Sequence, residues 1–582
     1  MIAALHGCSR LRSWYEGARR PGLMLAAIIF ILYVPSLFGG FVLDDHRCLR
    51  LLGEYHRGER QSLDVYRFLF GGQANREARE AGWYAWWLGD DVRYRHLRPA
   101  AEWALYGEYL LFGDRAIGFR LVGLGLYMLG VRLVLALFRL IGSDEALARW
   151  AALLFAVAAC HAVPVVFVSN HCDLIALAFG AGSMLAAGCF VRDGGAAKLL
   201  GAVVLFAVGL FSKEAVLPMA ILPACFWLVF RGRAGAGRRA WSAIIALAAC
   251  GLAWLTCYIL SDSGSNAVLM LDPIHAPLEY LAALPGRAIV LLSTWIIPFN
   301  PFLFLLRHEW SGGLYTYGAV GACCLLLLAA MYWRHHRRQQ GIVPMALWAL
   351  PFLPLLACTV PDDRVMMLPS IGLAFLGAAW MTRPRADGSR RLRVVPLALF
   401  VVLQLLTVLA AMGLVQFMES EAQEHLKVML AGLGRPARAG DHLFCLNGAR
   451  NFQTLFAQDR LLRLSNIGDL RASMLSDIPG PRVRVVDDHT IRLEAEQSPF
   501  FSSFAGQMGT SRTTSRRVGD TFSAGEFEGR IAEVRDGQVW AVELRFHQPI
   551  TSDSYRFYWS DAIGPPLLFD VRSQEYRSVS AK

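Results

Sequence analysis

Charged residues are scarce in this chain. Only 18% of its 582 residues are charged, against about a quarter in a typical soluble domain, while 55% are hydrophobic and the mean hydropathy is +0.40. A soluble fold of this composition would have to expose large apolar areas to water, which monomeric soluble proteins avoid. The composition therefore excludes an ordinary soluble enzyme and predicts an integral membrane protein.

The sequence also lacks the cysteine spacing of a disulfide framework or a zinc site. Most of its twelve cysteines fall inside apolar runs, where cysteine behaves as a small hydrophobic residue: Cys160, Cys189, Cys225, Cys250, Cys257, Cys323, Cys324 and Cys358. The net charge of +11 does not indicate nucleic-acid binding, because the basic residues cluster between apolar segments. Basic clusters at such positions orient membrane helices.

Long apolar runs recur from the N-terminal region onward. The first covers residues 23–42 and follows Arg10, Arg12, Arg19 and Arg20, so we expect a cytoplasmic N-terminus. No small-residue cleavage site follows this run, which favours an uncleaved span over a signal peptide. Residues 44–115 would then form a loop outside the cell membrane.

Later apolar runs predict a polytopic, all-α membrane domain over residues 1–417. The expected spans are 117–141, 150–168, 174–191, 196–211, 215–230, 241–260, 314–333, 342–360, 365–381 and 394–417. Residues 287–306 are interrupted by Pro298 and Pro301. We interpret them as a re-entrant hairpin, because a full span would place the basic residues 334–338 outside. The total is about eleven spans.

The last part of the chain, residues 418–582, changes to polar sequence with strand patterns. Alternation over 482–486 and 490–493 predicts a β-hairpin. A second hairpin is predicted over 531–534 and 539–546, with Asp536 and Gly537 in its turn. We expect a small β-rich (α+β) domain on the outer side, and we find no catalytic constellation in it.

Ionisable residues gather on the predicted outer face. Asp44 and Asp45 directly follow the first span, where partial burial and a neighbouring like charge can raise the pKa of a carboxylate and make it a base. The alternative is a solvated helix end. The same loop carries Trp83, Tyr84, Trp86 and Trp87, which we interpret as interface anchors. Arg95 and Arg98 follow them, and arginine is a residue type that suits phosphate.

Lys213 and Glu214 lie between two short apolar runs, so their turn should sit below the outer surface. A charged pair at that depth is costly unless it faces a polar cavity. The outer turns that carry His171 with Asp173, and Arg364, would border the same cavity. An ordinary charged turn is the alternative for 213–214. His161 is expected to be a satisfied polar residue between helices.

Four stretches in this order resemble the multi-span glycosyltransferases of the GT-C fold, especially the branch of the protein O-mannosyltransferases and the transmembrane, tetratricopeptide-containing mannosyltransferases. They are residues 41–45 (FVLDD), 94–99 (YRHLRP), 211–214 (FSKE) and 364–372 (RVMMLPSIG), with 161–174 as a weaker fifth. The chain departs from the pattern in three ways. The expected arginine before Asp173 is missing, Met366 and Met367 replace aromatic residues, and no tetratricopeptide repeats follow.

The resemblance implies an inverting transferase that passes a sugar from a polyprenyl-phosphate-linked donor to a hydroxyl of a glycan or protein acceptor on the outer side. Asp44 would be the base, and Asp45 would assist it or hold a divalent metal. The cations that would bind the donor phosphate are Lys213, Arg98 and Arg364. Supporting roles would fall to Glu214, Arg95, Asp173 and His171.

Two other functions fit the same membrane architecture. One is a polymerase or ligase for lipid-linked glycans that uses a lipid diphosphate donor. The other is non-enzymatic, either a flippase for lipid-linked sugars or a membrane scaffold. The composition, rich in arginine and alanine, favours a bacterial inner membrane with the C-terminal domain in the periplasm.

Overall fold

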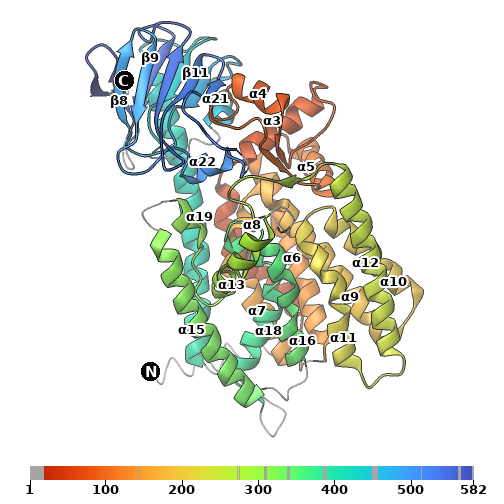
Figure 1. Cartoon of the computed structure of the whole chain (residues 1–582). Helices are drawn as coiled ribbons and strands as arrows, with labels where there is room; N and C mark the ends of the chain where they lie inside the picture. Colours follow the sequence, from red (N-terminus) through yellow and green to blue (C-terminus); the bar gives the residue numbers. More distant parts are fainter. Residues whose placement is uncertain are drawn as a thin grey trace.

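The computed structural model describes residues 19–579, apart from 143, 272, 274–275, 307–310, 337–340, 385–389, 393, 449–456, 513 and 561–564. A helical domain and a β-rich domain are joined by the long helix α19 (Val394–Ala431), which runs from the first into the second (Figure 1). The predicted basic residues Arg10, Arg12, Arg337 and Arg338 lie outside the described residues.

The predicted outer loop is an ordered part of the fold. After α2 (Pro21–Tyr33) and η1 (Val34–Phe38) it contains α3 (Asp45–His56), β1 (Arg67–Phe70), α4 (Gln73–Glu80), β2 (Arg93–Arg95) and α5 (Pro99–Phe112). Strand β2 lies between β1 and β3 (Gly264–Ser265) in a small antiparallel sheet. Two outer segments that are about 170 residues apart are therefore hydrogen-bonded to each other.

Most remaining helices belong to the membrane domain. The first group is α6 (Ala116–Leu140), α7 (Glu145–Ala156), η2 (Ala159–His161), α8 (Ala162–Val166), η3 (Val168–Asn170), α9 (His171–Asp193), α10 (Ala196–Leu210), η4 (Glu214–Ile221), α11 (Pro223–Phe230) and α12 (Ala236–Leu260). The second is α13 (Pro277–Ser293), α14 (Phe302–Leu306), α15 (Ser311–His336), α16 (Ile342–Trp348), η6 (Leu350–Phe352), α17 (Leu353–Leu356), η7 (Asp363–Met366) and α18 (Ser370–Met381). Strands β4 (Thr382–Pro384) and β5 (Arg390–Leu392) pair before α19.

Among the described residues, five helices are long and apolar enough to cross a membrane: Pro21–Phe38, Ala116–Leu140, Val168–Asp193, Ala236–Leu260 and Val395–Ala431. A sixth span is possible if Glu145–Ala156 and Ala159–Val166, which meet at 54°, count as one. The chain is therefore a multi-pass membrane protein. Several predicted spans form shorter or broken helices, and the total of about eleven stays a prediction.

Broken helices have local causes in the sequence. The predicted span 342–360 divides into α16, η6 and α17, and Pro351 and Pro354 stand at the starts of the two short turns. Proline cannot donate a backbone hydrogen bond, so it is favoured at such starts. In the predicted hairpin 287–306, α13 ends at Ser293 and the next helix begins at Phe302. The predicted interruption is present, while its relation to the bilayer stays a prediction.

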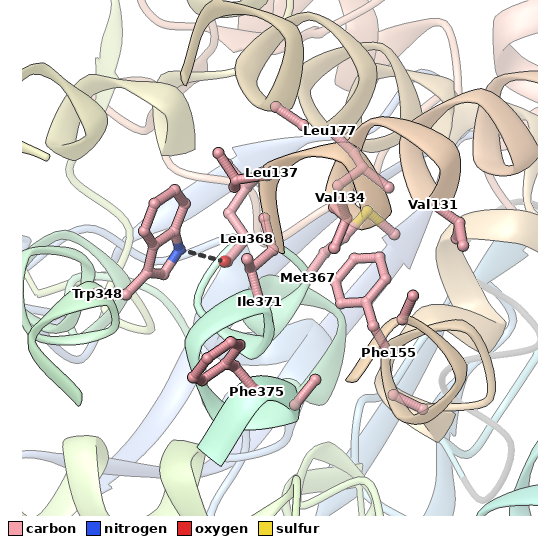
Figure 2. Packing of buried hydrophobic residues seen from close by; sticks show 14 of the residues in the cluster. Val131, Val134, Leu137, Phe155, Leu177, Trp348, Met367, Leu368, Ile371 and Phe375 are labelled. Carbon is pink, nitrogen blue, oxygen red and sulfur yellow. Dashed lines mark hydrogen bonds between the residues drawn. The ribbon is translucent and has the colours of Figure 1, made fainter. Parts of the chain in front are cut away.

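The centre of the helical domain is densely packed (Figure 2). Phe155, Met367 and Phe375 lie together there. The Trp348 indole N–H donates to the Leu368 carbonyl at 3.1 Å. These contacts fix the chain directly after η7, so they also fix the position of η7 itself, where Arg364 lies.

His161 is buried between helices, as predicted. Its Nδ1 lies 2.8 Å from the Tyr127 hydroxyl, and its Nε2 lies 3.0 Å from the Ser370 hydroxyl. Both ring nitrogens therefore have hydrogen-bond partners from other helices, which removes the penalty of burying an unpaired polar group. The prediction of a satisfied interhelical histidine is confirmed.

Two five-stranded sheets form most of the C-terminal domain. Their orders are β10-β11-β12-β9-β8 and β15-β14-β13-β6-β7. The strands are β6 (His442–Cys445), β7 (Arg471–Met474), β8 (Arg482–Asp487), β9 (Thr490–Glu494), β10 (Thr521–Ser523), β11 (Phe527–Arg535), β12 (Gln538–Phe546), β13 (Tyr555–Trp559), β14 (Leu567–Asp570) and β15 (Glu575–Ser578). Two helices, α21 (Ala457–Ser465) and α22 (Phe504–Met508), flank them.

Both predicted hairpins are confirmed. Strands β8 and β9 pair antiparallel, as do β11 and β12. In the second turn Asp536 and Gly537 have φ values of 50° and 74°. Two consecutive left-handed residues are the geometry that Asp-Gly favours in a tight hairpin. Local sequence alone therefore specifies these turns.

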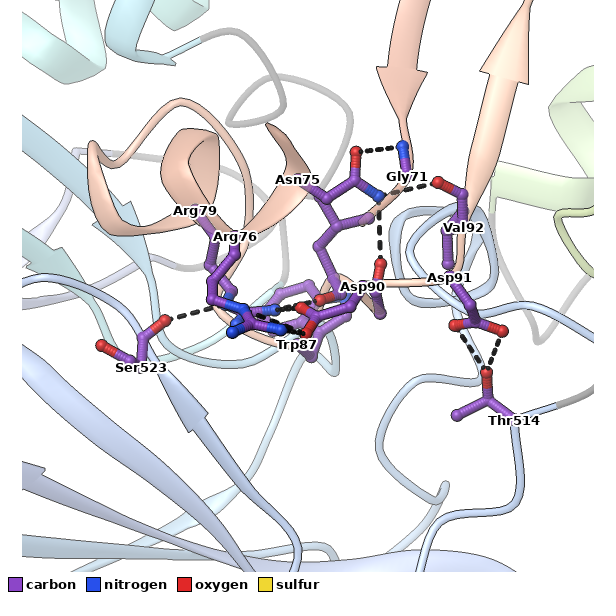
Figure 3. A network of polar contacts seen from close by, with 12 residues as sticks. Gly71, Asn75, Arg76, Arg79, Trp87, Asp90, Asp91, Val92, Thr514 and Ser523 are labelled. Atoms are coloured by element: carbon purple, nitrogen blue, oxygen red, sulfur yellow. Dashed lines mark hydrogen bonds and ion pairs between the residues drawn. The ribbon is translucent and has the colours of Figure 1, made fainter. Parts of the chain in front are cut away.

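The outer loop supplies part of the C-terminal domain's core. Trp86 and Trp87 are buried among residues of both sheets, and the Trp86 indole donates to the Leu475 carbonyl at 3.0 Å. Around them, Arg79 donates to the Ser523 carbonyl at 2.7 Å, and the Thr514 hydroxyl donates to Asp91 at 2.9 Å (Figure 3). The interpretation of these tryptophans as interface anchors is wrong, because they are enclosed in the protein core.

Candidate active site

Asp44 and Asp45 form the start of helix α3 and have different environments. Asp45 is fully buried, and its two carboxylate oxygens accept the backbone N–H groups of Ser169, at 2.8 Å, and Val42, at 3.1 Å. Asp44 is half-buried and accepts the Ser169 hydroxyl at 3.0 Å. Asp45 thus holds the loop to η3, the segment that precedes α9, while Asp44 keeps an accessible carboxylate.

The pKa of Asp44 is raised to about 6. Burial is the main cause, and the neighbouring Asp45 adds to it. Hydrogen bonding from Ser169 and the positive charge of Arg364 act in the opposite direction and favour the carboxylate. Asp44 is therefore mostly ionised at neutral pH, yet more basic than an exposed aspartate, which suits a general base.

A divalent metal at Asp44 and Asp45 was one of the possibilities predicted from the sequence. Both Asp45 oxygens are engaged by backbone N–H groups. Within the described part of the chain, no group of three or more His, Cys, Asp and Glu side chains is arranged to hold a metal ion. The donor atoms at Asp44 and Asp45 therefore do not fit a metal site, and we assign no catalytic step to a metal ion.

Arg364 faces Asp44 from the segment η7. Its Nε lies 2.8 Å from the Asp362 carboxylate, and its Nη1 donates to the Asn170 side-chain oxygen at 3.3 Å. Its side chain is 39% exposed, which makes it the most accessible of the three predicted phosphate-binding cations. Burial alone would lower the pKa of Arg364, but Asp362, Asp173 and Asp44 raise it above its ordinary value. It remains charged at any physiological pH.

The other two predicted cations are buried and paired. Arg98 donates to both Glu214 oxygens, at 3.0 and 2.5 Å, in a two-pronged geometry. Lys213 forms an ion pair with Asp173. Both cations have side chains only 10% exposed. A ligand phosphate would therefore interact with Arg98 and Lys213 only at a distance. Arg364 is exposed enough to contact the phosphate directly.

Tyr94 and His96 were not predicted as site residues, although both lie in the stretch that ends with Arg98. The tyrosine and histidine rings contact each other, with centroids 4.9 Å apart. Burial, reinforced by Arg98, lowers the pKa of His96 to about 3, so its imidazole is neutral. Its Nδ1 lies 3.8 Å from Glu214. Tyr94 and His96 could have been predicted as site residues because they lie in the same stretch, residues 94–99, as Arg98.

Two predicted supporting residues point elsewhere. Arg95 pairs with Asp262 at 2.9 Å, next to the small sheet that β2 shares with β3. His171 is buried, and its Nδ1 lies 3.0 Å from the Glu108 carboxylate. The structure therefore brings together Asp44, Arg98, Asp173, Lys213, Glu214 and Arg364, but assigns Arg95 and His171 to other contacts.

Asp363, next to Arg364, is an acid that was not among the predicted site residues. Burial and the adjacent Asp362 raise its pKa well above the usual range. One of its oxygens, Oδ1, has no hydrogen-bond partner among the described residues, and neither does the side-chain nitrogen of Asn170. Asp363 adjoins Arg364, and Asn170 adjoins Ser169, the hydrogen-bond partner of Asp44. These two buried polar atoms could therefore bind hydroxyl groups of a ligand.

No protein-family model matches the chain, and no curated protein does. Among solved structures, it is similar to an oligosaccharyltransferase of Archaeoglobus fulgidus tethered with an acceptor peptide. The TM-score is 0.39 at 12% identity, over 79% of this chain and 64% of that chain. It is also similar to ArnT from Cupriavidus metallidurans bound to undecaprenyl phosphate, with a TM-score of 0.38 at 13% identity, over 78% and 90%. The chain thus spans less than two thirds of the oligosaccharyltransferase, and similarities at these TM-scores are too low to assign a fold family or an activity.

Proposed function

We propose that this chain is a membrane glycosyltransferase of GT-C type that transfers a sugar from a polyprenyl-phosphate-linked donor to an acceptor hydroxyl on the outer side of the membrane. The observation that carries the proposal is that Asp44, a half-buried carboxylate with a raised pKa, lies near enough to the partly exposed cation Arg364 for the arginine's charge to act on it. A base for an incoming hydroxyl and a cation for a departing phosphate are the two groups that such a displacement needs.

Asp44 takes the proton of the acceptor. As the acceptor oxygen forms a bond to the anomeric carbon, its O–H proton passes to the Asp44 carboxylate. On the opposite side, the bond between the anomeric carbon and the phosphate oxygen breaks, and the electron pair leaves with the polyprenyl phosphate. One direct displacement inverts the anomeric centre and leaves no sugar bound to the enzyme.

Arg364 stabilises the charge that develops on the leaving phosphate. A fixed cation in a partly buried site acts more strongly than one in water, because little solvent screens it. Arg98 and Lys213 are held in place by Glu214 and Asp173, and these carboxylates offset most of their positive potential. In this scheme Arg364 binds the phosphate directly, whereas Arg98 and Lys213 act on it only electrostatically, from a distance.

The experiment that tests this proposal uses purified full-length protein in vesicles. A panel of labelled, short-chain polyprenyl-phosphate and polyprenyl-diphosphate sugars is supplied, with membranes from cells that lack the gene as the acceptor source. We expect the wild type to transfer one of these sugars and Asp44→Asn to lose at least about 1,000-fold in kcat while donor binding persists. Asp114→Asn, whose side chain is 75% exposed, is the matched control.

The alternatives give different results in the same assay. A flippase or scaffold predicts no transfer by the wild type from any donor. A polymerase or ligase predicts transfer only from lipid diphosphate donors. Undiminished turnover by Asp44→Asn would refute Asp44 as the base.

A further inference from the structure

The loop that carries Asp44 is held by a residue far along the chain. Glu419, twelve residues before the end of α19, accepts the backbone N–H of Leu43 at 3.2 Å and lies 2.8 Å from Nε2 of His46. Both contacts flank the acidic pair directly. Glu419 is only 5% exposed, so few water molecules can replace these contacts.

Leu43 needs this support because of its backbone conformation. Its φ of 48° is in the left-handed region, which is unfavourable for a residue with a side chain. Such a conformation persists only where surrounding contacts enforce it. The Glu419 carboxylate binds the N–H of this residue, and the next residue is Asp44. Glu419 therefore helps to set the direction in which the Asp44 side chain leaves the backbone.

Glu419 in turn depends on the C-terminal domain. Arg460 of helix α21 donates to its carboxylate from Nε, at 3.0 Å, and from Nη2, at 2.8 Å. Arg460 is 1% exposed. A buried carboxylate without such a partner would be strongly destabilised. The two-pronged pair also fixes the orientation of the carboxylate plane.

Other residues of α21 contact the same part of the outer loop. Asp459 pairs with Arg50 of α3 at 2.6 Å, and the Arg463 guanidinium lies 5.0 Å from the centre of the Phe41 ring. Helices α21 and α3 lie side by side where the two domains meet (Figure 1). One helix of the C-terminal domain thus contacts the chain before and after Asp44.

We propose that Glu419, clamped by Arg460, is a positioning residue for Asp44, so that the C-terminal domain completes the active site of the membrane domain. This inference rests on the proposed role of Asp44 as the base. It assigns to residues 418–582 a function in the transfer step itself, through the orientation of one loop, in addition to any binding function of that domain.

The test measures kcat and the donor KM separately for Arg460→Met, Arg460→Lys and a matched control. The control is Thr514→Val, which removes a contact between the C-terminal domain and Asp91 of the outer loop, away from α3. We expect Arg460→Met to lower kcat at least tenfold with the donor KM within about twofold of wild type. Arg460→Lys should recover part of kcat, and Thr514→Val should leave both constants unchanged.

A second variant covers the case in which Arg460→Met fails to fold. The double variant Glu419→Leu with Arg460→Met leaves no unpaired buried charge, yet still removes the contact to Leu43. It should fold and show the same loss in kcat. Combined with Asp44→Asn, it should cause no further loss, because both changes act on one group.

Wild-type kcat in the double variant, or a loss confined to KM, would overturn the positioning role. An equal loss in Thr514→Val would also overturn it, because the effect would then come from general loosening of the domain. Failure of the proposed function itself has a separate signature, since the wild type would then transfer no sugar from any donor.

Discussion

Removing the hydroxyl of Ser169 should shift the pH dependence of transfer to higher pH. This hydroxyl donates to Asp44 at 3.0 Å and favours the ionised carboxylate, which is the form that can accept a proton. In Ser169→Ala the ionised form loses that stabilisation, so the pKa of Asp44 rises above about 6. The Ser169 backbone N–H still binds Asp45, so the loop itself keeps its anchor.

The size of the shift follows from the hydrogen bond. A hydrogen bond to a charged group contributes about 1.5–3 kcal/mol when buried, and we take about 1.4 kcal/mol because Asp44 is only half-buried and water replaces part of it. That corresponds to about one pH unit, from about 6 to about 7. At pH 6 the ionised fraction falls from about one half to about one tenth, so activity drops about fivefold. At pH 8.5 it hardly changes.

The assay is kcat/KM for sugar transfer in vesicles between pH 4.5 and 8.5, since this ratio reports ionisations of the free enzyme. Ser62→Ala is the matched control, because it removes a serine–aspartate hydrogen bond, to Asp64, in an exposed part of the outer loop. Its midpoint should equal that of the wild type. If the Ser169→Ala profile kept the wild-type midpoint and only its plateau were lower, the rise of kcat/KM with pH could not be assigned to the ionisation of Asp44.

Three further changes test the site and the domain arrangement. Arg364→Gln should lower kcat about 100-fold by removing a cation from the leaving phosphate, and steady-state kinetics that show only a raised KM would contradict this role. Lys213→Met should lower the free energy of unfolding by roughly 3–5 kcal/mol because Asp173 is left buried and unpaired; a thermal melt equal to wild type would argue against the pair. Trp86→Ala should destabilise the C-terminal domain by roughly 3–5 kcal/mol, so limited proteolysis should cut it faster, while the exposed Trp241→Ala should be cut at the wild-type rate.

Local features of the structure could be predicted from the sequence. The hairpin turn at Asp536 and Gly537 needs only two adjacent residues that tolerate left-handed backbone. His161 was placed correctly because a polar ring inside an apolar run must find partners between helices. The clustering of Asp44, Lys213 and Arg364 followed from assigning their turns to one side of the membrane.

Contacts between distant segments could not be predicted in this way. Arg95 resembled a phosphate ligand in the sequence, yet it pairs with Asp262 next to the sheet that joins β2 to β3, and no local pattern encodes that pairing. Trp86 and Trp87 had the composition of a membrane-interface loop, but they complete the core of a domain that begins more than 300 residues later. Hydrophobicity reports that a side chain will be buried, while only tertiary structure decides which core buries it.

Predicted helix lengths failed where proline or a bend interrupts an apolar run. Residues 150–168 read as one span, but the chain bends by 54° between α7 and the helix that follows. That bend leads into η3, where Ser169 and Asn170 face Asp44 and Arg364. Irregular backbone within a membrane domain is tolerated where protein or a polar site surrounds it. The bend between α7 and the next helix therefore lies where we would expect it, next to the candidate active site.

Whether this chain transfers a sugar through Asp44 can be decided from the surface glycan profile of cells that lack the gene. The cells are complemented with wild type or with Asp44→Asn at equal protein level. We expect one sugar to be missing from a glycan in the deletion, to return with the wild type, and to stay missing with Asp44→Asn. An unchanged profile in the deletion, or full restoration by Asp44→Asn, would contradict it.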